Sequence, residues 1–581
     1  MRVTYFFSVL VLMFIALFLL SCPSPAKARL TVTSDRAFRR IDAIALGSIT
    51  LVYAVTAFIG LGDTGSAQSF HRFQSGESAV IDLGTIRDID SAMLYSGLNT
   101  GSYRIETSAD GEHWANADSF EQNYVSLFKW NDVEALSGAR ARYIRLTAEG
   151  SVWLGELGIK CGGELCGSSS DAPELFDEQE YVPEYQHYTN STYFDEIYHA
   201  RTAFENLEGV YPYEVSHPPL GKLIIAIGIQ LFGMTPFGWR FSGTLFGVLM
   251  LPVMYIFIKK LFGRTSVAVC GTAIFAFDFM HFTQTRIATI DTYAVFFILL
   301  MYLFMYLYIT GGRLRYLAMS GLFFGLGAAS KWTCIYAGAG LAVLWLIYWI
   351  RHFELNAFLK NCAFCIVFFI LIPAAIYYAS YYPYGAARGM NGLGMYFTSD
   401  YASIVLDNQK FMFTYHSGVT AEHPYSSRWW QWIVDDRPIL YYLKYFDDGT
   451  RSSFGAFLNP VLCWGGLAAM VICAVLLIKR HDEASLLIIV GYFAQLLPWL
   501  FITRTTFEYH YFPSSVFLVL ALCRVFSLIR ENNAKSWRFS VYGFTVLSLV
   551  VFALFYPVLS GLRVNAEVAT NLLKWLPNWP F

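Results

Sequence analysis

The sequence predicts a polytopic α-helical membrane protein that carries one inserted extracytoplasmic β-sandwich. Three observations indicate this fold class. Of the 581 residues, 56% are hydrophobic and 14% are charged, whereas soluble chains carry roughly 25% charged residues. Many apolar runs approach the length of about 20 residues that crosses a bilayer. Residues 65–162 differ, because their apolar runs are short and alternate with polar residues.

The composition excludes several classes of protein. The 41 Lys and Arg nearly balance the 43 Asp and Glu, and the net charge is -2. Such a chain has no global positive field that would hold a nucleic acid, so no nucleic-acid partner is expected. The excess of apolar residues excludes a soluble enzyme and a disordered chain. It makes the lipid bilayer the first expected partner.

Eleven apolar segments are predicted to span the membrane, and the boundaries of 316–330 are the least clear. They form one first core span, a group of six and a group of four. In chain order they are residues 41–61; then 238–258, 265–282, 289–310, 316–330, 333–350 and 361–382; and then 456–478, 484–502, 508–529 and 539–560.

The distribution of Lys and Arg predicts the orientation of these spans. Loops that follow alternate spans carry clusters of Lys and Arg, whereas the opposite short loops carry only Arg286, Lys331 and Arg504. Because Lys and Arg are enriched in cytoplasmic loops, this alternation places the C-terminus outside. Two large loops, residues 62–237 and 383–455, are expected on the same outer side.

A twelfth apolar segment, residues 5–20, has two interpretations. The sequence LLSC at residues 19–22 resembles a lipoprotein cleavage box, which would make the segment a signal peptide. Cleavage there would place the loop 62–237 in the cytoplasm, against the charge pattern of every later loop. The interpretation as an additional membrane helix is therefore favoured.

These features divide the chain into eight parts. They are residues 1–40, an N-terminal hydrophobic segment and cytoplasmic loop; 41–61, the first core span; 65–162, the β-sandwich; 163–237, an outer loop with juxtamembrane helices; 238–382, a group of spans; 383–455, a large outer loop; 456–561, the C-terminal spans; and 562–581, an outer tail.

Four short runs of alternating apolar and polar residues predict the fold of the inserted module. They indicate strands at residues 79–84, 103–108, 142–146 and 156–160, separated by turn residues. Cys161 and Cys166 follow the last strand. They either form a disulfide in an oxidising compartment or remain free thiols.

The module resembles the discoidin, or factor V/VIII type C, family of galactose-binding-like sandwiches. The resemblance rests on the strand Ile81-Asp82-Leu83-Gly84, on 103–108 with Asp110-Gly111 and Trp114, and on 142–146. It implies loops that bind glycans or lipid head groups, or a scaffold without a ligand. Candidates for stacking on a sugar are Trp114, Trp130 and Trp153, although Trp more often packs in a core.

Four polar clusters lie at predicted outer ends of spans, where polar side chains are costly and need a partner. Each cluster alone also has a structural interpretation, as a loop cap, an interface anchor or an ion pair. The clusters are Asp195 and Glu196, followed by His217 and Lys222; Arg240; Arg286 with Asp291; and Lys331 with Arg504, Glu508, Tyr509 and His510.

The cations of these clusters suggest an anionic ligand. Arg286, Lys331 and Arg504 are the exceptions to the charge rule, and all three fall within the clusters. Arg and Lys both suit phosphate, and a carboxylate at a membrane surface can act as a general base toward a hydroxyl. Alternatively, the cations pair with the carboxylates. A divalent metal could join Asp195, Glu196 or Asp291, but no ligand spacing demands one.

Taken in order, the motifs resemble the protein O-mannosyltransferases, polytopic glycosyltransferases of the GT-C class with eleven spans. The resemblance covers residues of about 190–530 and the first core span. A tryptophan-rich stretch at 426–438 also matches. The motifs are FDEIY at 194–198, HPPLGK at 217–222, WRF at 239–241, RIATID at 286–291, SKWT at 330–333 and EYHYFP at 508–513.

The resemblance implies transfer of mannose, with inversion, from a polyprenyl (dolichyl) phosphate to Ser or Thr of a protein crossing the membrane. Asp195 matches the family's catalytic Asp, and Glu196 is its neighbour. Arg240 matches an essential arginine at the membrane edge and is expected at the donor phosphate. His217 and Lys222 lie in the matching juxtamembrane segment, and Lys331 and Arg504 are further expected phosphate ligands. The lipid-linked donor is the substrate, and no other cofactor is expected.

Two departures qualify the resemblance. The loop 383–455 has no room for the β-trefoil module of eukaryotic members, which favours a bacterial type in the cytoplasmic membrane with its active site on the outer face. The inserted sandwich precedes the Asp195–Glu196 pair, which leaves substrate choice open. One alternative is a related transferase that adds another sugar to a lipid or cell-wall glycan. Another is a non-enzymatic transporter or glycan-binding receptor.

Overall fold

The computed structural model describes residues 37–418, 422–532 and 537–581. They form two compact units, each described by itself. The helical unit comprises the described residues of Met1–Ile59, Val215–Gly221 and Gly243–Phe581, and the sandwich unit comprises Gly60–Glu214 and Lys222–Ser242. The predicted segment 5–20, with the possible cleavage box beside it, lies outside the described residues.

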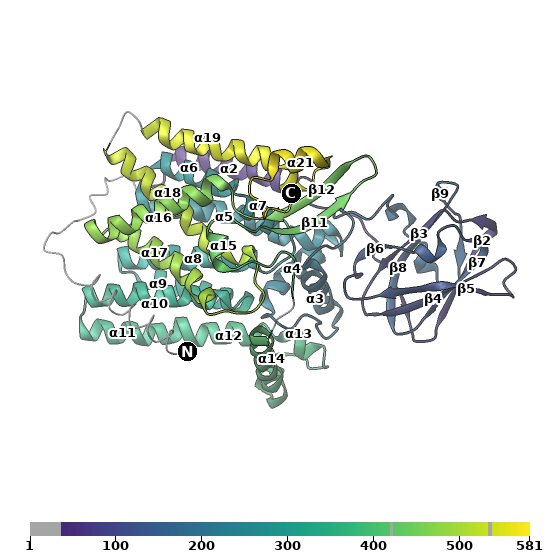
Figure 1. Ribbon diagram of the computed structural model, residues 1–581. Helices are drawn as coiled ribbons and strands as arrows, with labels where there is room; N and C mark the ends of the chain where they lie inside the picture. The colour runs from purple at the N-terminus through teal and green to yellow at the C-terminus, as the bar shows by residue number, and fades with distance from the viewer. Residues whose placement is uncertain (1–36, 419–421, 533–536) are drawn as a thin grey trace. The chain divides into compact units, whose positions relative to one another are not determined.

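All eleven predicted core spans are helical, which confirms a multi-pass helical protein. Among the described residues, nine helices are long and apolar enough to cross a membrane, and one bent pair raises the number to ten. α9 (Leu314–Ser330), at the predicted span 316–330, is not among these nine or ten. The helices at the eleven predicted spans (Figure 1) are α2 (Arg40–Phe58), α5 (Pro236–Phe262), α6 (Thr265–Ala276) with α7 (Phe279–Thr285), α8 (Asp291–Gly311), α9, α10 (Thr333–Arg351), α11 (Leu355–Cys365) with η4 (Ile366–Leu371) and α12 (Ile372–Ala379), α16 (Pro460–Arg480), α17 (Glu483–Leu496) with η6 (Leu497–Leu500), α18 (Phe512–Asn532) and α19 (Trp537–Phe555).

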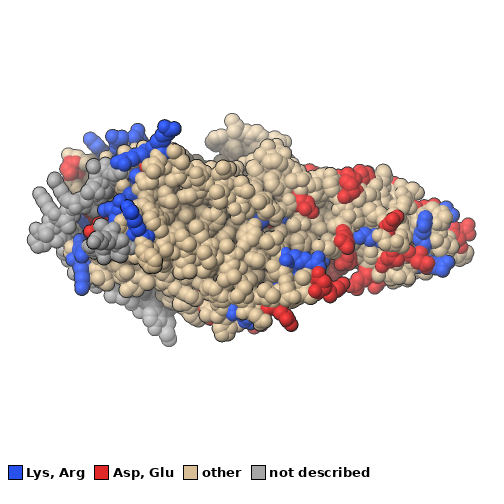
Figure 2. All heavy atoms as spheres, turned by 90° about the horizontal axis from the view of Figure 1, so that it is seen from above, with Lys and Arg blue, Asp and Glu red and all other residues tan. Residues whose placement is uncertain are grey.

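Basic side chains gather at one end of the helical unit, next to a wide band without charges (Figure 2). α5 ends with Lys259 and Lys260, α10 with Arg351, and α16 with Lys479 and Arg480. Cations near a helix C-terminus complement the helix dipole. The uncharged band has the character of a surface that faces lipid.

The predicted span 265–282 is not one straight helix. α6 and α7 are bent relative to each other by 56°. Asp278 caps α7 by accepting a hydrogen bond from the backbone of His281, and its other oxygen accepts one from the backbone of Asn459 at 2.8 Å. The run looks continuous in sequence because one Asp does not interrupt its hydropathy. Asn459, whose backbone N–H bonds the Asp278 carboxylate, is 181 residues away along the chain.

The large outer loop 383–455 and the tail 562–581 fold together. β12 (Thr450–Ala456) pairs with β11 (Ile439–Tyr445) and with β13 (Val564–Asn565) in one antiparallel sheet. The indole of Trp579 donates a hydrogen bond to the backbone oxygen of Asp435 at 2.7 Å. The sequence alone predicts these segments as two separate parts. The same loop also contains α14 (Ser399–Gly418) and α15 (Trp429–Ile433).

The sandwich unit contains two five-stranded antiparallel sheets around one core, and all four predicted strands are present. One sheet has the order β1-β8-β3-β6 with β9 beside β8, and the other has the order β10-β2-β7-β4-β5. The strands are β1 (His71–Phe73), β2 (Ser78–Asp88), β3 (Ser91–Ser96), β4 (Gly101–Ser108), β5 (Ala115–Gln122), β6 (Lys129–Asp132), β7 (Arg140–Ala148), β8 (Val152–Cys161), β9 (Glu164–Leu165) and β10 (Ser169–Ser170).

Strand periodicity explains the sandwich core. Ala79, Ile81 and Leu83 alternate along β2, so their side chains share the face that is turned to the other sheet and are almost completely buried. Cys161 and Cys166 form a disulfide that closes the β8–β9 hairpin. Of the two alternatives that the sequence leaves open, the structure therefore has the bridge. Two helices of this unit follow the sandwich, α3 (Glu196–Glu208) and most of α4 (Leu220–Phe232).

Candidate active site

Asp195 and Glu196 stand at the start of α3. Asp195 is the N-cap residue and is partly exposed, whereas Glu196 is fully buried in the first turn. Phe194, directly before them, has φ of +46°. A bulky residue in this left-handed region is strained, and such strain is concentrated at functional sites. The turn that presents Asp195 is therefore one that the surrounding structure has to hold in place.

Arg240 holds that turn from α5. Its guanidinium forms two hydrogen bonds of 2.7 Å with the Glu196 carboxylate, and it also donates to the backbone oxygens of Leu61 at 2.8 Å and Ser191 at 3.0 Å. Both charged side chains are 0% exposed. The sequence predicted that Arg240 binds phosphate. In the structure Arg240 is the partner of Glu196 and its donors point to protein oxygens, whereas its role at the donor phosphate stays a prediction.

Lys222 is also paired within the sandwich unit. Its ammonium group is fully buried, forms an ion pair with the Glu214 carboxylate and donates to the backbone oxygen of the same residue at 2.6 Å. His199 lies 4.0 Å from the Glu214 carboxylate. The structure thus gives Lys222 a carboxylate partner where the sequence suggested a phosphate.

A cavity of about 270 Å³ in the helical unit brings together the other predicted phosphate ligands. Lys331 follows α9, Arg504 follows η6, and His217 lies in the segment ahead of α4. Aromatic side chains enclose these cations. The full lining is His217, Pro218, Lys331, Trp332, Thr333, Tyr336, Met412, Phe413, His416, Ser417, Trp499, Ile502 and Arg504.

The cations of this cavity, which we call the cationic cavity, are held in defined positions. Lys331 pairs with Asp291 at 2.6 Å, and its ammonium group lies 5.5 Å from the centre of the Tyr509 ring. The rings of His217 and His416 contact each other, with centres 5.1 Å apart. A cavity with Lys331 and Arg504 on its wall, close to an aromatic surface, suits a phosphate that is attached to an apolar chain.

His416, on α14, is a cavity residue that the sequence does not predict. Its Nε2 lies 2.7 Å from the backbone oxygen of Ser216, which only an N–H can satisfy. Burial lowers the pKa of His416 to about 4, and the charges of His217, Arg504 and Lys331 add to this effect. His416 is therefore neutral at pH 7. No local signal marks it, because its contacts are with residues far away in the sequence.

Among the other predicted site residues, Arg286, Glu508 and His510 also lie outside the lining of the cationic cavity. Arg286 donates to the backbone oxygens of Ala57 at 3.0 Å and Ile59 at 2.8 Å, at the C-terminal end of α2. Cations at this position stabilise exposed helix carbonyls. Glu508 is fully buried beside the carboxyl of Asp435. His510 packs against aromatic rings, with its centre 4.4 Å from that of Trp499 and 4.4 Å from that of Tyr509.

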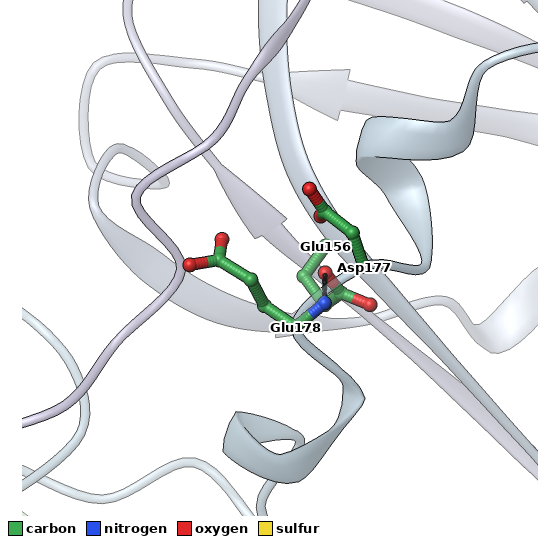
Figure 3. Close-up of side chains that lie close together, drawn as sticks. All are labelled: Glu156, Asp177 and Glu178. Atoms are coloured by element: carbon green, nitrogen blue, oxygen red, sulfur yellow. Dashed lines mark hydrogen bonds between the residues drawn. The ribbon is translucent and has the colours of Figure 1, made fainter.

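An acidic cluster in the sandwich unit has a structural explanation. Glu156, Asp177 and Glu178 lie close together (Figure 3). Glu156 accepts hydrogen bonds from the backbone of Glu178 and from the side chain of Gln179, and the other two carboxylates accept from residues 68 and 69. These bonds connect three segments of chain. The cluster is thus a polar junction that fastens residues 177–179 to β8.

The three tryptophans proposed for sugar stacking have different surroundings. Trp114 packs under Arg145 and Trp153 under Arg72, with the guanidinium carbon 4.2 Å and 3.8 Å from the ring centre. Trp130 is 1% exposed and packs against Tyr95. Cation–π and core contacts therefore account for most of their surface.

Comparisons with known proteins define the class. Residues 216–378 match the family model of dolichyl-phosphate-mannose-protein mannosyltransferase, and residues 401–579 match that of the C-terminal four TMM region of protein-O-mannosyltransferase. Together the two matches cover more than half of the chain. The protein is a polytopic membrane glycosyltransferase. It belongs to the protein O-mannosyltransferase family, which confirms the resemblance that the motifs indicate.

Relatives and a solved structure agree with this assignment. The chain is 26% identical over 480 residues to the polyprenol-phosphate-mannose–protein mannosyltransferase of Mycobacterium tuberculosis, covering 71% of this chain and 88% of that protein. It is 27% identical over 482 residues to the Mycolicibacterium smegmatis protein of the same name, covering 71% and 89%. Its fold is similar to the Saccharomyces cerevisiae Pmt1–Pmt2 complex bound to the sugar donor, with a TM-score of 0.59, 14% identity, and coverage of 67% and 89%.

Proposed function

We propose that this protein transfers mannose from a polyprenyl-phosphate donor to Ser or Thr hydroxyls of proteins at the outer face of a bacterial cytoplasmic membrane. The observation that carries the proposal is the cationic cavity, in which Lys331 and Arg504 lie among aromatic side chains. The bacterial relatives of similar length are named for this donor and for protein acceptors. An anionic group on a lipid is the ligand that this lining suits.

The donor phosphate is the leaving group, and the cationic cavity is proposed to bind it. Lys331 and Arg504 supply charge-assisted hydrogen bonds, which strengthen as negative charge develops on the departing phosphate. His217 lies at the same wall, whereas the neutral His416 already donates its N–H to the backbone oxygen of Ser216. Asp291 holds the Lys331 ammonium in place through the 2.6 Å ion pair. An ammonium group that is already oriented costs less entropy when the donor binds.

Asp195 is proposed as the general base. It takes the proton of the acceptor hydroxyl, whose oxygen attacks the anomeric carbon of mannose while the bond from that carbon to the phosphate oxygen breaks. The new glycosidic bond then has inverted configuration. Glu196 and Arg240 position the turn of α3 that presents Asp195, because the buried pair links this turn to the backbone of Leu61 and Ser191.

The outer location and the nature of the sandwich are parts of the same proposal. The Cys161–Cys166 disulfide supports an oxidising environment for the sandwich unit. Two five-stranded antiparallel sheets around one core support the interpretation as a discoidin-like module. The Lys and Arg residues at the basic end of the helical unit support a cytoplasmic position for the span ends that carry them.

The test replaces Asp195 with Asn in the purified full-length enzyme. We expect transfer of mannose from a polyprenyl-phosphate-mannose to a Ser/Thr peptide to fall by at least about 100-fold, since general base catalysis contributes roughly 10²–10⁴-fold. Donor binding should persist, because Asp195 does not line the cationic cavity. The matched control is Asp177→Asn, which changes an exposed carboxylate of the same unit. Near-normal turnover in Asp195→Asn would contradict the mechanism.

A further inference from the structure

Two elements of the large outer loop expose large apolar side chains. They are η5 (Leu393–Phe397) and α14, and both belong to the helical unit. Phe397 is 89% exposed and Phe413 is 70% exposed, and Leu393 and Leu406 are also mostly exposed. Exposed groups of large apolar residues mark a surface that meets a partner or a membrane.

The exposed surface of α14 is divided into an apolar and a polar stripe. Leu406 and Phe413 are seven residues apart, which is close to two turns, so their side chains share one face. Each is followed by an exposed polar residue, Asp407 or Thr414, which lies about 100° further around the helix. Asp407 forms an ion pair with Lys410 at 3.2 Å. An apolar stripe beside a polar one is typical of a helix that lies in a membrane interface.

The direction of α14 agrees with such a position. α14 runs across the direction of α11 and α12 rather than along it (Figure 1). These two helices belong to a candidate membrane span of which only a small share is buried inside the protein, whereas α14 itself is not apolar enough to span. A helix that crosses a span lies along the plane of the membrane.

Hydrogen bonds hold α14 at the end of this span. The hydroxyl of Tyr377, on α12, donates to the amide oxygen of Gln409 at 2.6 Å, and that of Tyr381, just beyond α12, donates to the amide oxygen of Asn408 at 2.6 Å. Tyr side chains are enriched where spans leave the hydrocarbon. α11 begins beside the basic end of α10, so the far end of α12 and α14 lie at the opposite surface.

α14 also forms part of the wall of the cationic cavity, which we call its rim. The rim residues are Met412, Phe413, His416 and Ser417. Phe413 belongs both to the apolar stripe and to the rim, so the two surfaces are continuous. The contact of His416 with the backbone oxygen of Ser216, at 2.7 Å, ties the rim to the segment that carries His217.

Acyl chains are the occupant that the apolar stripe suits, because the stripe continues the lipid-facing surface of α11 and α12. Phe411 and Tyr415 lie on the other flank of α14 and do not extend the stripe. Their rings stack on each other with centres 5.9 Å apart. We propose that α14 and η5 dock on the acyl chains of the outer leaflet and so hold the rim of the cationic cavity at the bilayer surface. A second step rests on the proposed function: the lipid-linked donor enters the cavity from the leaflet past Phe413.

Nitroxide labels on the full-length protein in liposomes of phosphatidylethanolamine and phosphatidylglycerol test the docking. The label is attached to Leu406→Cys or to the matched control Asp407→Cys, both at exposed positions of α14. Electron paramagnetic resonance compares collisions of the label with oxygen, which concentrates among acyl chains, and with a nickel chelate, which stays in water. The ratio of oxygen to nickel collisions should be several times higher at Leu406→Cys. The unmodified protein gives the background, because its seven described free cysteines are buried or half-buried.

Two results would overturn the docking. Equal access of the nickel chelate to both positions would place α14 in water. Loss of access for both reagents at Leu406→Cys would mean that a protein, such as a second copy of the chain, covers the stripe. Phe397→Cys in η5 provides an independent position and should behave as Leu406→Cys does. These variants should unfold at the temperature of the unmodified protein, because the replaced side chains are exposed.

Transfer measurements separate the role of the rim from the proposed function. Leu406→Glu puts a charge on the apolar stripe, and Thr414→Glu puts the same charge on the polar stripe. With polyprenyl-phosphate-mannose in liposomes, kcat/KM for the donor should fall several-fold in Leu406→Glu and stay unchanged in Thr414→Glu, because a charge is costly among acyl chains. Equal values in the two variants would overturn the role of the rim. Absence of transfer in the unmodified protein would contradict the proposed function alone, since the label measurement needs no transfer.

Discussion

Arg240 and Glu196 are fully buried, and each satisfies the charge of the other. A buried ion pair is costly to break, because removing one partner leaves an uncompensated charge in a medium that cannot solvate it. The pair also carries function in the proposed mechanism, because Glu196 directly follows Asp195 in the first turn of α3. A role in positioning and a role in phosphate binding predict different kinetics.

Arg240→Ala should lower the free energy of unfolding by about 3–5 kcal/mol, the usual cost of breaking a buried pair. Thermal unfolding in detergent measures this change. If Arg240 positions Asp195, donors that still bind are turned over slowly, so kcat falls and the donor KM stays within about twofold. A large rise in the donor KM with normal kcat would instead restore the role as a phosphate ligand.

The control for this experiment is a double-mutant cycle with Glu196→Gln. Removing the carboxylate charge as well should recover part of the stability lost in Arg240→Ala, because the unpaired charge is then absent. Fully additive losses would mean that the 2.7 Å contacts contribute little to the fold.

Glu156 makes the sandwich unit sensitive to pH. Burial raises the pKa of Glu156 from its ordinary value of about 4.5 to about 7. The folded state therefore binds the proton more tightly than the unfolded state does. The contribution of the protonated Glu156 to the free energy of unfolding is complete below about pH 4.5 and is lost as the pH rises through 7. Calorimetry should show the unfolding temperature of the sandwich falling over this window.

Glu156→Gln removes this titration and should flatten the pH dependence. It should also lower the baseline stability, because the carboxylate accepts hydrogen bonds through both oxygens and a glutamine has only one acceptor oxygen. Glu184→Gln, at an exposed carboxylate, provides the comparison and should keep the slope of unfolding temperature against pH. An unchanged slope in Glu156→Gln would assign the pH dependence to another group.

At the residue scale, the sequence predicts which side chains belong to sites better than it predicts their partners. Lys331 and Arg504 stand out as cations where the charge rule expects none, and both line the cationic cavity. Arg240 and Glu196 are 44 residues apart, and His416 and Ser216 are 200 apart. Only the fold brings such pairs together, so composition and spacing could not identify them.

At the scale of elements, spans and strands are predictable because each has its own periodicity. A run of about 20 apolar residues suffices for a membrane helix, and alternation suffices for β2. The bend between α6 and α7 is different, because it depends on contacts of Asp278 with the backbone at Asn459. The pairing of β12 with β13 likewise joins residues more than 100 positions apart.

The C-terminal tail is tied to the outer loop by Trp579, which is 1% exposed and packs against Phe457 with ring centres 4.9 Å apart. Trp579→Ala should cost about 3–5 kcal/mol of stability, as large-to-small changes of buried aromatic residues do. Trp575 stacks on the ring of Trp579 but is 40% exposed, so Trp575→Ala should cost clearly less. Equal losses in thermal unfolding would mean that the tail is held by surface contacts alone.

At the scale of the whole molecule, the charge pattern and the disulfide both support the proposed orientation. Lys479 and Arg480 end α16 at the basic end of the helical unit, and the positive-inside rule assigns such ends to the cytoplasm. The Cys161–Cys166 disulfide favours an oxidising compartment, which the proposed location on the outer side of the membrane provides. Each unit contributes one of these independent observations.

Cysteine labelling in intact cells tests this orientation. Glu184→Cys introduces a thiol in an exposed segment of the sandwich unit, and Lys479→Cys introduces one at the basic end of α16. A maleimide that cannot cross the membrane should label the first variant in intact cells. It should label the second only after the cells are opened, because the positive-inside rule places that end in the cytoplasm. The seven free cysteines of the described residues are buried or half-buried, so the unmodified protein gives the background signal. Labelling of Lys479→Cys before Glu184→Cys would invert the topology and place the sandwich inside the cell.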